Sequence, residues 1–170
     1  MEKYFILWQL IWFIGFLSFI IKRYGIQDSI SDSFRAMEKE YGEGSLKPYL
    51  FWLFLINISW PIWAIFLNGW AFFSMAGIVV VGAAATYWKD KLTERAHVVG
   101  ATGGIALAFI ALGFSYKKIV WLIPLAFYAL PIYGITVLIL KLKKVKNFTW
   151  WIETVAFIYI VALEILIKWR

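Results

Sequence analysis

Six mostly apolar stretches, each about as long as a membrane is thick, constrain this chain more than any other feature of its sequence. The hydrocarbon core of a bilayer is about 30 Å thick, and roughly 20 apolar residues of α-helix are needed to cross it. The stretches run over residues 4–21, 49–67, 70–88, 96–114, 119–140 and 148–167. Lipid offers no partners for exposed backbone groups, and the stretches lack the alternation of a barrel strand, so we expect six transmembrane helices.

The composition excludes a soluble domain. The sequence is 63% hydrophobic and 16% charged, whereas globular proteins carry roughly 45–50% apolar and about 25% charged residues. The first stretch is too long for the apolar part of a signal peptide and has no small-residue cleavage site after it, so we expect it to be a retained span. We therefore predict one all-α integral membrane domain over residues 1–170, a polytopic helical bundle.

The positions of the basic residues predict the orientation. The first, third and fifth connections hold 12 Lys and Arg residues, while the termini and the other connections hold 5. Because short cytoplasmic loops retain positive charge, we expect both termini outside the cytoplasm of a bacterial-type inner (plasma) membrane. Basic loops beside the bilayer also account for the net charge of +7 through contact with anionic lipid, without nucleic acid as a partner.

The first connection contains an amphipathic segment. Four apolar residues recur at helical spacing and form one stripe: Ile30, Phe34, Met37 and Tyr41. Ser29 and Asp32 are spaced as in a capping box, and Gly42 is a helix stop signal. The pattern predicts a helix over residues 29–41 that lies on the cytoplasmic membrane surface. It would be either a structural element or a lid over a site beneath it.

Several kinds of chemistry are excluded by residues that the sequence lacks. With no cysteine, it cannot form disulfides or thiolate metal sites, and with His97 as its one histidine it cannot form a multi-histidine metal site. We therefore expect neither a metal nor a cofactor.

Ionisable residues inside the apolar stretches are the candidate functional groups, since each costs roughly 2.5–3.5 kcal/mol at the centre of a span. Glu153 lies about a turn and a half into the last stretch, and His97 lies about one turn into the fourth, on the same side of the membrane. We expect the two to share one site, with a proton shared between imidazole and carboxyl. A lone histidine is equally compatible with a hydrogen-bonded packing role.

Glu164 follows Glu153 by three helical turns, so both carboxyl groups fall on one helix face that should point into the bundle. Glu164 is also close enough to the outer end to reach the interface. Other candidate residues of a polar cavity are Asp28, Ser29, Ser31, Asp32, Ser33, Asn57 and Glu94. Glu94 and the neighbouring Asp90 would also suit the N-terminus of a helix without any further role.

Small residues predict close packing of the third and fourth spans. Gly100 and Gly104 have the spacing that lets two helix backbones approach, and residues 82–85 are Gly-Ala-Ala-Ala at the same depth. The two surfaces should meet just where His97 lies.

Four segments carry a resemblance: Tyr24–Ser33, Gly82–Ala85, Leu92–Ala101 and Trp150–Phe157. Together they make the chain similar to a group of small, uncharacterised six-span membrane proteins of bacteria and their phages. That resemblance covers nearly the whole chain and singles out the Ser/Asp run, His97 and Glu153, but implies no activity. The chain more distantly resembles the ceramidase and progestin-receptor-like superfamily of seven-span membrane hydrolases. Their zinc requires three histidines, and this chain has one.

Three functions remain open. The pattern favours a transport or channel-type protein with a cytoplasm-facing polar cavity that handles a proton, an ion or a small solute, because intramembrane ionisable groups mark pathways. A homo-oligomer would supply a pore if one chain is too narrow. The alternatives are a membrane-embedded hydrolase of a lipid-like substrate, with Glu153 or His97 as general base near a serine of residues 29–33, and a non-catalytic accessory or effector protein, such as a phage-associated subunit. No nucleophile motif supports an enzyme, so a non-enzymatic function is preferred.

Overall fold

The computed structural model describes residues 2–42, 45–46, 49–67, 69–86, 88–114 and 122–168. Every regular element in these ranges is an α-helix, which confirms the all-α class. The helices are α1 (Glu2–Tyr24), α2 (Asp32–Tyr41), α3 (Tyr49–Phe66), α4 (Gly69–Ala83), α5 (Lys91–Phe114), α6 (Leu122–Leu142) and α7 (Phe148–Lys168).

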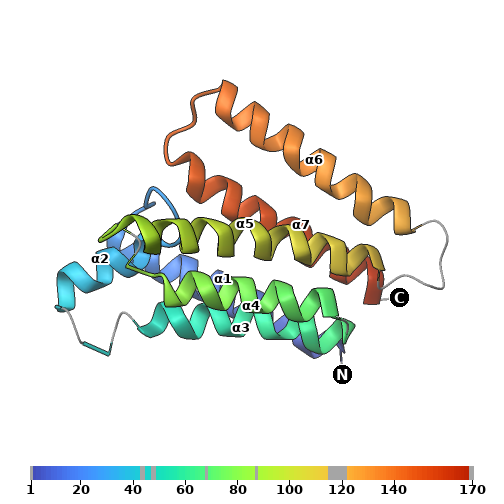
Figure 1. Ribbon diagram of the computed structural model, residues 1–170, viewed down its shortest axis with the longest axis horizontal. Helices are drawn as coiled ribbons and strands as arrows, with labels where there is room; N and C mark the ends of the chain where they lie inside the picture. The colour runs from blue at the N-terminus through green and yellow to red at the C-terminus, as the bar shows by residue number, and fades with distance from the viewer. Residues whose placement is uncertain are drawn as a thin grey trace.

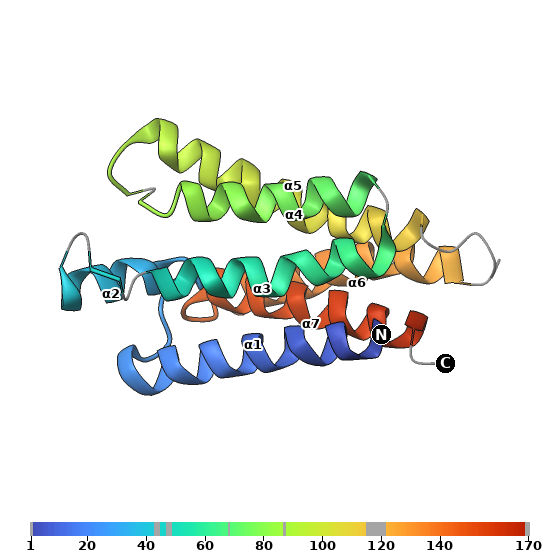
Figure 2. The ribbon, with the colours of Figure 1, turned by 90° about the horizontal axis from the view of Figure 1, so that it is seen from below.

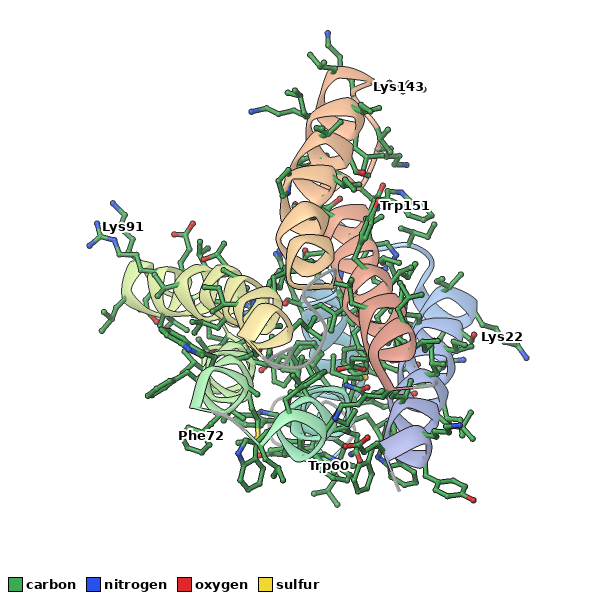
Figure 3. All side chains as sticks on the ribbon, turned by 90° about the vertical axis from the view of Figure 1, so that its right-hand side faces the viewer. Lys22, Trp60, Phe72, Lys91, Lys143 and Trp151 are labelled. Carbon is green, nitrogen blue, oxygen red and sulfur yellow. The ribbon has the colours of Figure 1, made fainter. Side chains whose placement is uncertain are left out.

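Six of the helices run alongside one another, and the short α2 lies at one end of them (Figure 1). Both termini lie at the opposite end. We call the end that carries α2 and the 84–90 and 143–147 connections the basic end. Viewed from below, α1, α3 and α4 lie in succession, with α5 beyond α4 (Figure 2). Figure 3, viewed from the end with the termini, shows α6 as the outermost helix, standing beyond α7.

Within the described residues, four helices are long and apolar enough to cross a membrane: α1, α3, α5 and α7. Less than half of the most apolar part of each is buried inside the protein, between 33% and 44%. Large apolar side chains such as Ile14, Leu53 and Ile158 are instead exposed. Apolar surface on this scale requires lipid around it, so the four helices indicate a membrane location.

Two of the six predicted spans differ from expectation. The third ends at Ala83 rather than near residue 88, because residues 84–86 form a turn, and α4 is thus 15 residues long. The fifth prediction, 119–140, begins in residues 119–121, which lie outside the described residues. The apolar helical segment Pro131–Leu142 of α6 is shorter than a span. The described residues thus contain four candidate spans, where the sequence predicts six.

Stacked aromatic rings join α1, α3 and α7 at the centre of the bundle. The ring of Phe13 stacks on Phe157 with 3.9 Å between the ring centroids, and Phe16 stacks on Phe54 at 4.1 Å. All four side chains are buried. Offset aromatic stacking of this kind adds to the apolar burial and fixes the three helices against one another.

Glycines let α4 and α5 approach each other closely, as predicted for the third and fourth spans. A Cβ atom on Gly77 would lie 2.9 Å from Gly104 Cα, and one on Gly100 would lie 2.8 Å from Gly77 O. The Ser74 hydroxyl adds a hydrogen bond of 2.7 Å to Gly104 O. The contact on α4 is therefore made by Gly77, whereas Gly82 packs against the Trp52 ring of α3.

The amphipathic helix exists, but its apolar side is buried in the protein. Ile30 and Met37 belong to the same buried cluster as Phe51 of α3, and Phe34 packs against it. The helix starts at Asp32, whose backbone N–H donates to Ser29 Oγ at 3.0 Å, and it stops at Gly42, whose φ is 85°. The predicted stop is confirmed. The predicted hydrogen bond between Ser29 and Asp32 is present, but the helix begins at Asp32 rather than at Ser29, and its N-cap residue, Ser31, makes no side-chain capping bond. The apolar stripe packs on the basic end of the bundle rather than facing lipid.

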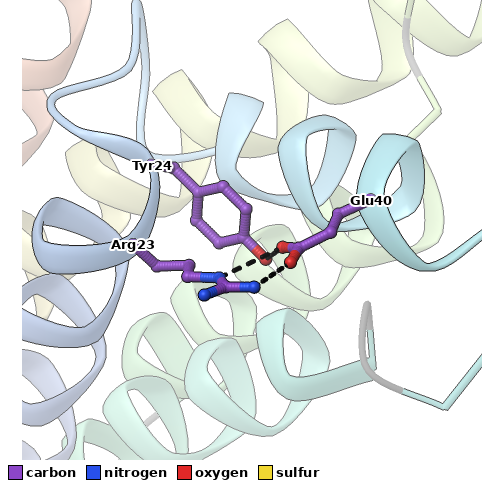
Figure 4. Close-up of polar contacts among 3 residues, drawn as sticks. All are labelled: Arg23, Tyr24 and Glu40. Atoms are coloured by element: carbon purple, nitrogen blue, oxygen red, sulfur yellow. Dashed lines mark hydrogen bonds and ion pairs between the residues drawn. The ribbon is translucent and has the colours of Figure 1, made fainter.

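A cluster of three polar side chains fastens α2 to the end of α1 (Figure 4). The Glu40 carboxylate accepts hydrogen bonds from the Arg23 guanidinium and, at 2.5 Å, from the Tyr24 hydroxyl. The hydrogen bond from Arg23 is the largest effect on Glu40, and it lowers the pKa of that carboxyl below its ordinary value. On the other side of α2, Lys89 forms an ion pair with Glu38 at 3.5 Å.

Candidate functional site

The loop of residues 25–31 crosses the beginning of α7 and is held there by backbone hydrogen bonds. The Asn147 side-chain amide donates to Ile26 O and to Gln27 O, each at 2.7 Å. The Trp150 N–H donates to Asp28 O at 3.0 Å. Since these bonds use main-chain groups of the loop, they fix its path whatever side chains it carries. The Ser/Asp run is therefore placed against the start of α7, where Trp150 is buried.

Glu153 makes the next contact with this loop. Its Oε2 accepts a hydrogen bond of 2.6 Å from the backbone N–H of Ile30. A charged acceptor at this distance is among the strong hydrogen bonds of proteins. Glu153 thus has a donor from the chain itself, which reduces the cost of placing a carboxyl group in an apolar helix.

His97 is buried and contacts the residue that follows Ile30. Its Nδ1 lies 3.0 Å from Ala84 O, and its Nε2 lies 2.9 Å from Ser31 Oγ. A backbone carbonyl can only accept, so Nδ1 carries a hydrogen, and in the neutral ring Nε2 accepts the hydroxyl proton of Ser31. The turn after α4 therefore sets the tautomer of the histidine.

A cavity of about 330 Å³ opens beside these contacts, and we call it the polar cavity. Six of the nine predicted site residues line it: Asp28, Ser29, Asp32, Glu94, His97 and Glu153. Thr102 of α5, Tyr133 of α6 and Thr149 of α7 line it too. His97 and Glu153 thus line one cavity, and each is bonded to one of two consecutive loop residues.

The remaining predicted residues lie elsewhere. Ser31 is buried and lines a separate cavity described below. Ser33 is buried, and its hydroxyl forms no hydrogen bond with the described part of the chain. Asn57 belongs to neither cavity: its Nδ2 donates to Leu53 O, and its Oδ1 accepts from Trp8 Nε1 at 2.9 Å. Asn57 therefore links α3 to α1 and is not part of the described lining of the polar cavity.

A second, apolar cavity of about 90 Å³ lies in the centre of the bundle, and we call it the apolar cavity. Its walls are mainly aromatic and aliphatic, including Phe13, Phe54 and Phe157, and Ser31 reaches it as well. Glu153 lines both cavities, as do Ala101 and Ile105 of α5. The two cavities are therefore neighbours, and Glu153 stands between them.

Tyr133, like Thr102 and Thr149, is a cavity residue that was not among the predicted site residues. Its hydroxyl donates to Ile152 O at 3.2 Å, which joins α6 to α7 beside Glu153. Tyrosine is common in membrane proteins near the interfaces, so a tyrosine in an apolar stretch does not stand out as a costly group in the way that a carboxyl group does. Its position beside the cavity follows from the packing of α6 against α7, which the sequence does not show.

Asp90 serves the start of α5. Its carboxylate accepts hydrogen bonds from the Thr93 backbone N–H at 2.8 Å and from the Thr93 hydroxyl at 2.5 Å. These bonds, the hydroxyl contact foremost, lower the pKa of Asp90. This is a helix-capping role, which is one of the two interpretations that the sequence left open.

Within the described ranges, no three His, Asp or Glu side chains come close enough together to hold a metal ion. No family model, curated protein or solved structure matches this chain. Its class accordingly rests on the fold and the cavities: an all-helical protein with several apolar helices and a polar cavity at its basic end.

Proposed function

We propose that this protein is a six-span membrane protein whose polar cavity takes up a small cationic solute from the cytoplasm. One observation carries the proposal. The polar cavity is lined by four carboxyl side chains, those of Asp28, Asp32, Glu94 and Glu153, and its described lining contains no Lys or Arg. A chain with a net charge of +7 thus places acidic groups around its polar cavity. Such a lining favours cations electrostatically.

The size and other groups of the cavity suit a small organic cation. Ligand pockets in proteins span roughly 300–1,000 Å³, and the polar cavity, at about 330 Å³, is at the lower end. Hydroxyl groups of Thr102, Tyr133 and Thr149 supply further acceptors. An alkylammonium ion suits the charge and the size of the cavity. Its ammonium group would pair with the carboxylates, and its short alkyl chain would contact Val98 and Ile105.

In this proposal α4 and α6 complete six spans, and the basic end faces the cytoplasm. The positive-inside rule supports that orientation, because the basic connections gather at the end where α2 lies. Both termini would then be extracytoplasmic in a bacterial-type inner membrane. The polar cavity would open to the cytoplasm, with Glu153 at its boundary to the apolar cavity.

Uptake of labelled methylammonium into proteoliposomes tests the function. We expect saturable uptake by the wild-type protein and a loss of about tenfold or more in Glu153→Gln, because removing one partner of a desolvated charge pair costs about 2–5 kcal/mol. Glu2→Gln changes a carboxyl that lies near the N-terminus, outside the cavity, and should leave uptake unchanged. Uptake equal to that of protein-free liposomes, or full uptake by Glu153→Gln, would refute the proposal.

A second candidate function is favoured by the hydrogen bond between Ser31 and His97. A serine that donates to a histidine of fixed tautomer has the arrangement of an activated nucleophile. Ser31 also reaches the apolar cavity, whose aromatic and aliphatic walls would contact the acyl part of an ester. In this alternative Ser31 Oγ attacks an ester carbonyl, its proton passes to His97 Nε2 and then to the leaving alkoxide, and water later hydrolyses the acyl-serine.

A long-chain fluorophosphonate probe tests this alternative without knowledge of the substrate. If Ser31 is a nucleophile, the probe should label wild-type protein at Ser31 and label neither Ser31→Ala nor His97→Gln. Ser33→Ala is the matched control, because Ser33 is a buried serine two residues away whose hydroxyl forms no hydrogen bond with the described part of the chain. An unlabelled wild-type protein would mean that the hydrogen bond only holds the loop in place.

A further inference from the structure

A second carboxyl group is buried in α7, towards the end of the bundle that carries the termini. Glu164 is 0% exposed, and neither of its carboxyl oxygens forms a hydrogen bond with a described residue. Its position differs from that of Glu153, which accepts a bond from Ile30 N–H and borders the polar cavity. The sequence allowed Glu164 to reach the interface, but in the structure the side chain stays inside the protein.

The polar group that lies against Glu164 is the side chain of Gln9, from α1. Gln9 is itself fully buried, and its Nε2 donates to Ile58 O of α3 at 2.9 Å. Because a carbonyl can only accept, this bond fixes the amide orientation and leaves Gln9 Oε1 as an acceptor. Oε1 has no donor among the described residues. The Gln9 amide thus lies beside the carboxyl group, and Gln9 Oε1 and both Glu164 oxygens are buried without a hydrogen-bond donor among the described residues.

No ion pair among the described residues involves Glu164. Lys168, one turn further along α7, donates instead to Glu2 Oε1 at 2.8 Å and lies 5.7 Å from the centre of the Phe66 ring. Residues 5–21 of α1 and the whole of α3 contain no charged residue. The ionisable residues of α5, which are Lys91, Glu94, Arg95 and His97, lie towards the basic end, as do Tyr133 and Lys141 of α6. In α7, the titratable residue between Glu153 and Glu164 is Tyr159.

An ionised carboxylate is costly in such surroundings, and it could not donate to Gln9 Oε1. A neutral carboxylic acid avoids the cost and supplies one O–H donor. We propose that Glu164 and Gln9 form an intramembrane proton-binding site, in which Glu164 is protonated at neutral pH and its O–H donates to Gln9 Oε1. This inference is independent of the cation cavity, which lies at the other end of α7.

The site has a functional consequence. Glu153 and Glu164 lie on one face of α7, and Ala156 and Ile160 between them line the apolar cavity. One carboxyl group has a backbone donor beside a polar cavity, and the other is sealed among apolar residues. When two carboxyl groups lie in environments that differ in this way, one can be protonated while the other is ionised. Glu164 is therefore expected to keep its proton under conditions in which Glu153 is ionised.

Infrared difference spectroscopy of the purified protein in liposomes tests the site directly. At neutral pH we expect the C=O band of a protonated carboxyl group, which shifts in D₂O and is lost in Glu164→Gln. Gln9→Leu should keep the band but move it to higher frequency, since the O–H would lose its acceptor. Glu2→Gln is the control and should leave the band unchanged, because Glu2 is partly exposed and paired with Lys168.

Labelling with dicyclohexylcarbodiimide, which adds to protonated carboxyl groups in apolar surroundings, provides a second measurement. In a Glu153→Gln background we expect one labelled residue, Glu164, and no effect of Na⁺ at constant pH. If neither Glu164→Gln nor Gln9→Leu alters the infrared band, Glu164 is ionised and the proposal is wrong. If Na⁺ removes the band or blocks labelling, the pair is a metal-cation site, and the proton site is likewise overturned.

Discussion

Gly77→Val is expected to destabilise the folded protein by about 3 kcal/mol, because forcing extra atoms into a well-packed interface costs typically 1–3 kcal/mol and occasionally more. Even the first added atom is blocked, since a Cβ on Gly77 would lie 2.9 Å from Gly104 Cα and 3.0 Å from Gly100 O. These contacts are to backbone, which cannot move aside as a flexible side chain can. Unfolding in detergent, followed by circular dichroism, measures the loss.

Gly103→Val is the matched control for this substitution. Gly103 lies next to Gly104 on α5, but a Cβ there meets nothing within 4 Å. The change should be neutral or stabilise the helix by a few tenths of a kcal/mol, as valine has a higher helix propensity than glycine. Equal stability of Gly77→Val and Gly103→Val would contradict the close approach of α4 and α5.

The packing of these two helices also bears on the polar cavity. α4 ends in the turn that contains Ala84, and Ala84 O accepts from His97 of α5. Separation of α4 from α5 would therefore remove the group that sets the histidine tautomer. We expect Gly77→Val to impair cavity function beyond its effect on the amount of folded protein.

The lengths of the apolar stretches predicted α1, α3, α5 and α7 well, because span length is set by membrane thickness alone. They could not show that α4 stops at Ala83, which depends on a local turn. The period of Ile30, Phe34 and Met37 predicted the apolar side of α2. It did not distinguish lipid from the protein core, because both are apolar, and Met37 proved to be buried inside the protein.

The sequence could predict those parts of the candidate site that follow from the free-energy cost of an ionisable group in a membrane and from its depth in a span. Glu153 and His97 are both costly to place in a membrane and lie at a similar depth, and both line the polar cavity. The hydrogen bonds that connect them could not be predicted, because they involve the Ile30 N–H and the Ser31 hydroxyl of a loop. The hydrogen bond from Trp8 to Asn57 could not be predicted either, because it depends on how α1 packs on α3.

His97→Ala and Glu153→Leu are each expected to destabilise the protein by about 2–3 kcal/mol, since each leaves a buried donor or acceptor without its partner. The two losses should not add. Glu153 holds the loop at Ile30, and His97 holds it at Ser31. Once one substitution has released the loop, the remaining hydrogen bond contributes less to the free energy of unfolding. We expect the double variant to be less damaging than the sum by on the order of 1 kcal/mol.

The control cycle combines His97→Ala with Asn57→Ala, which removes the α1–α3 contact to Trp8 elsewhere in the bundle. These two losses should add within about 0.5 kcal/mol, as is usual for separate sites. Free energies of unfolding for the single and double variants provide the measurement. If the His97 and Glu153 losses also add, the two residues act independently, and the shared site is wrong.

Glu153→Gln separates the two roles of this residue. A glutamine retains a carbonyl oxygen that can accept from Ile30 N–H, so the loop should stay in place and most of the stability should be kept. The negative charge at the boundary of the two cavities is nevertheless lost. A stable Glu153→Gln protein without methylammonium uptake would therefore show that the charge binds the cation, whereas Glu153→Leu should lose uptake and stability together.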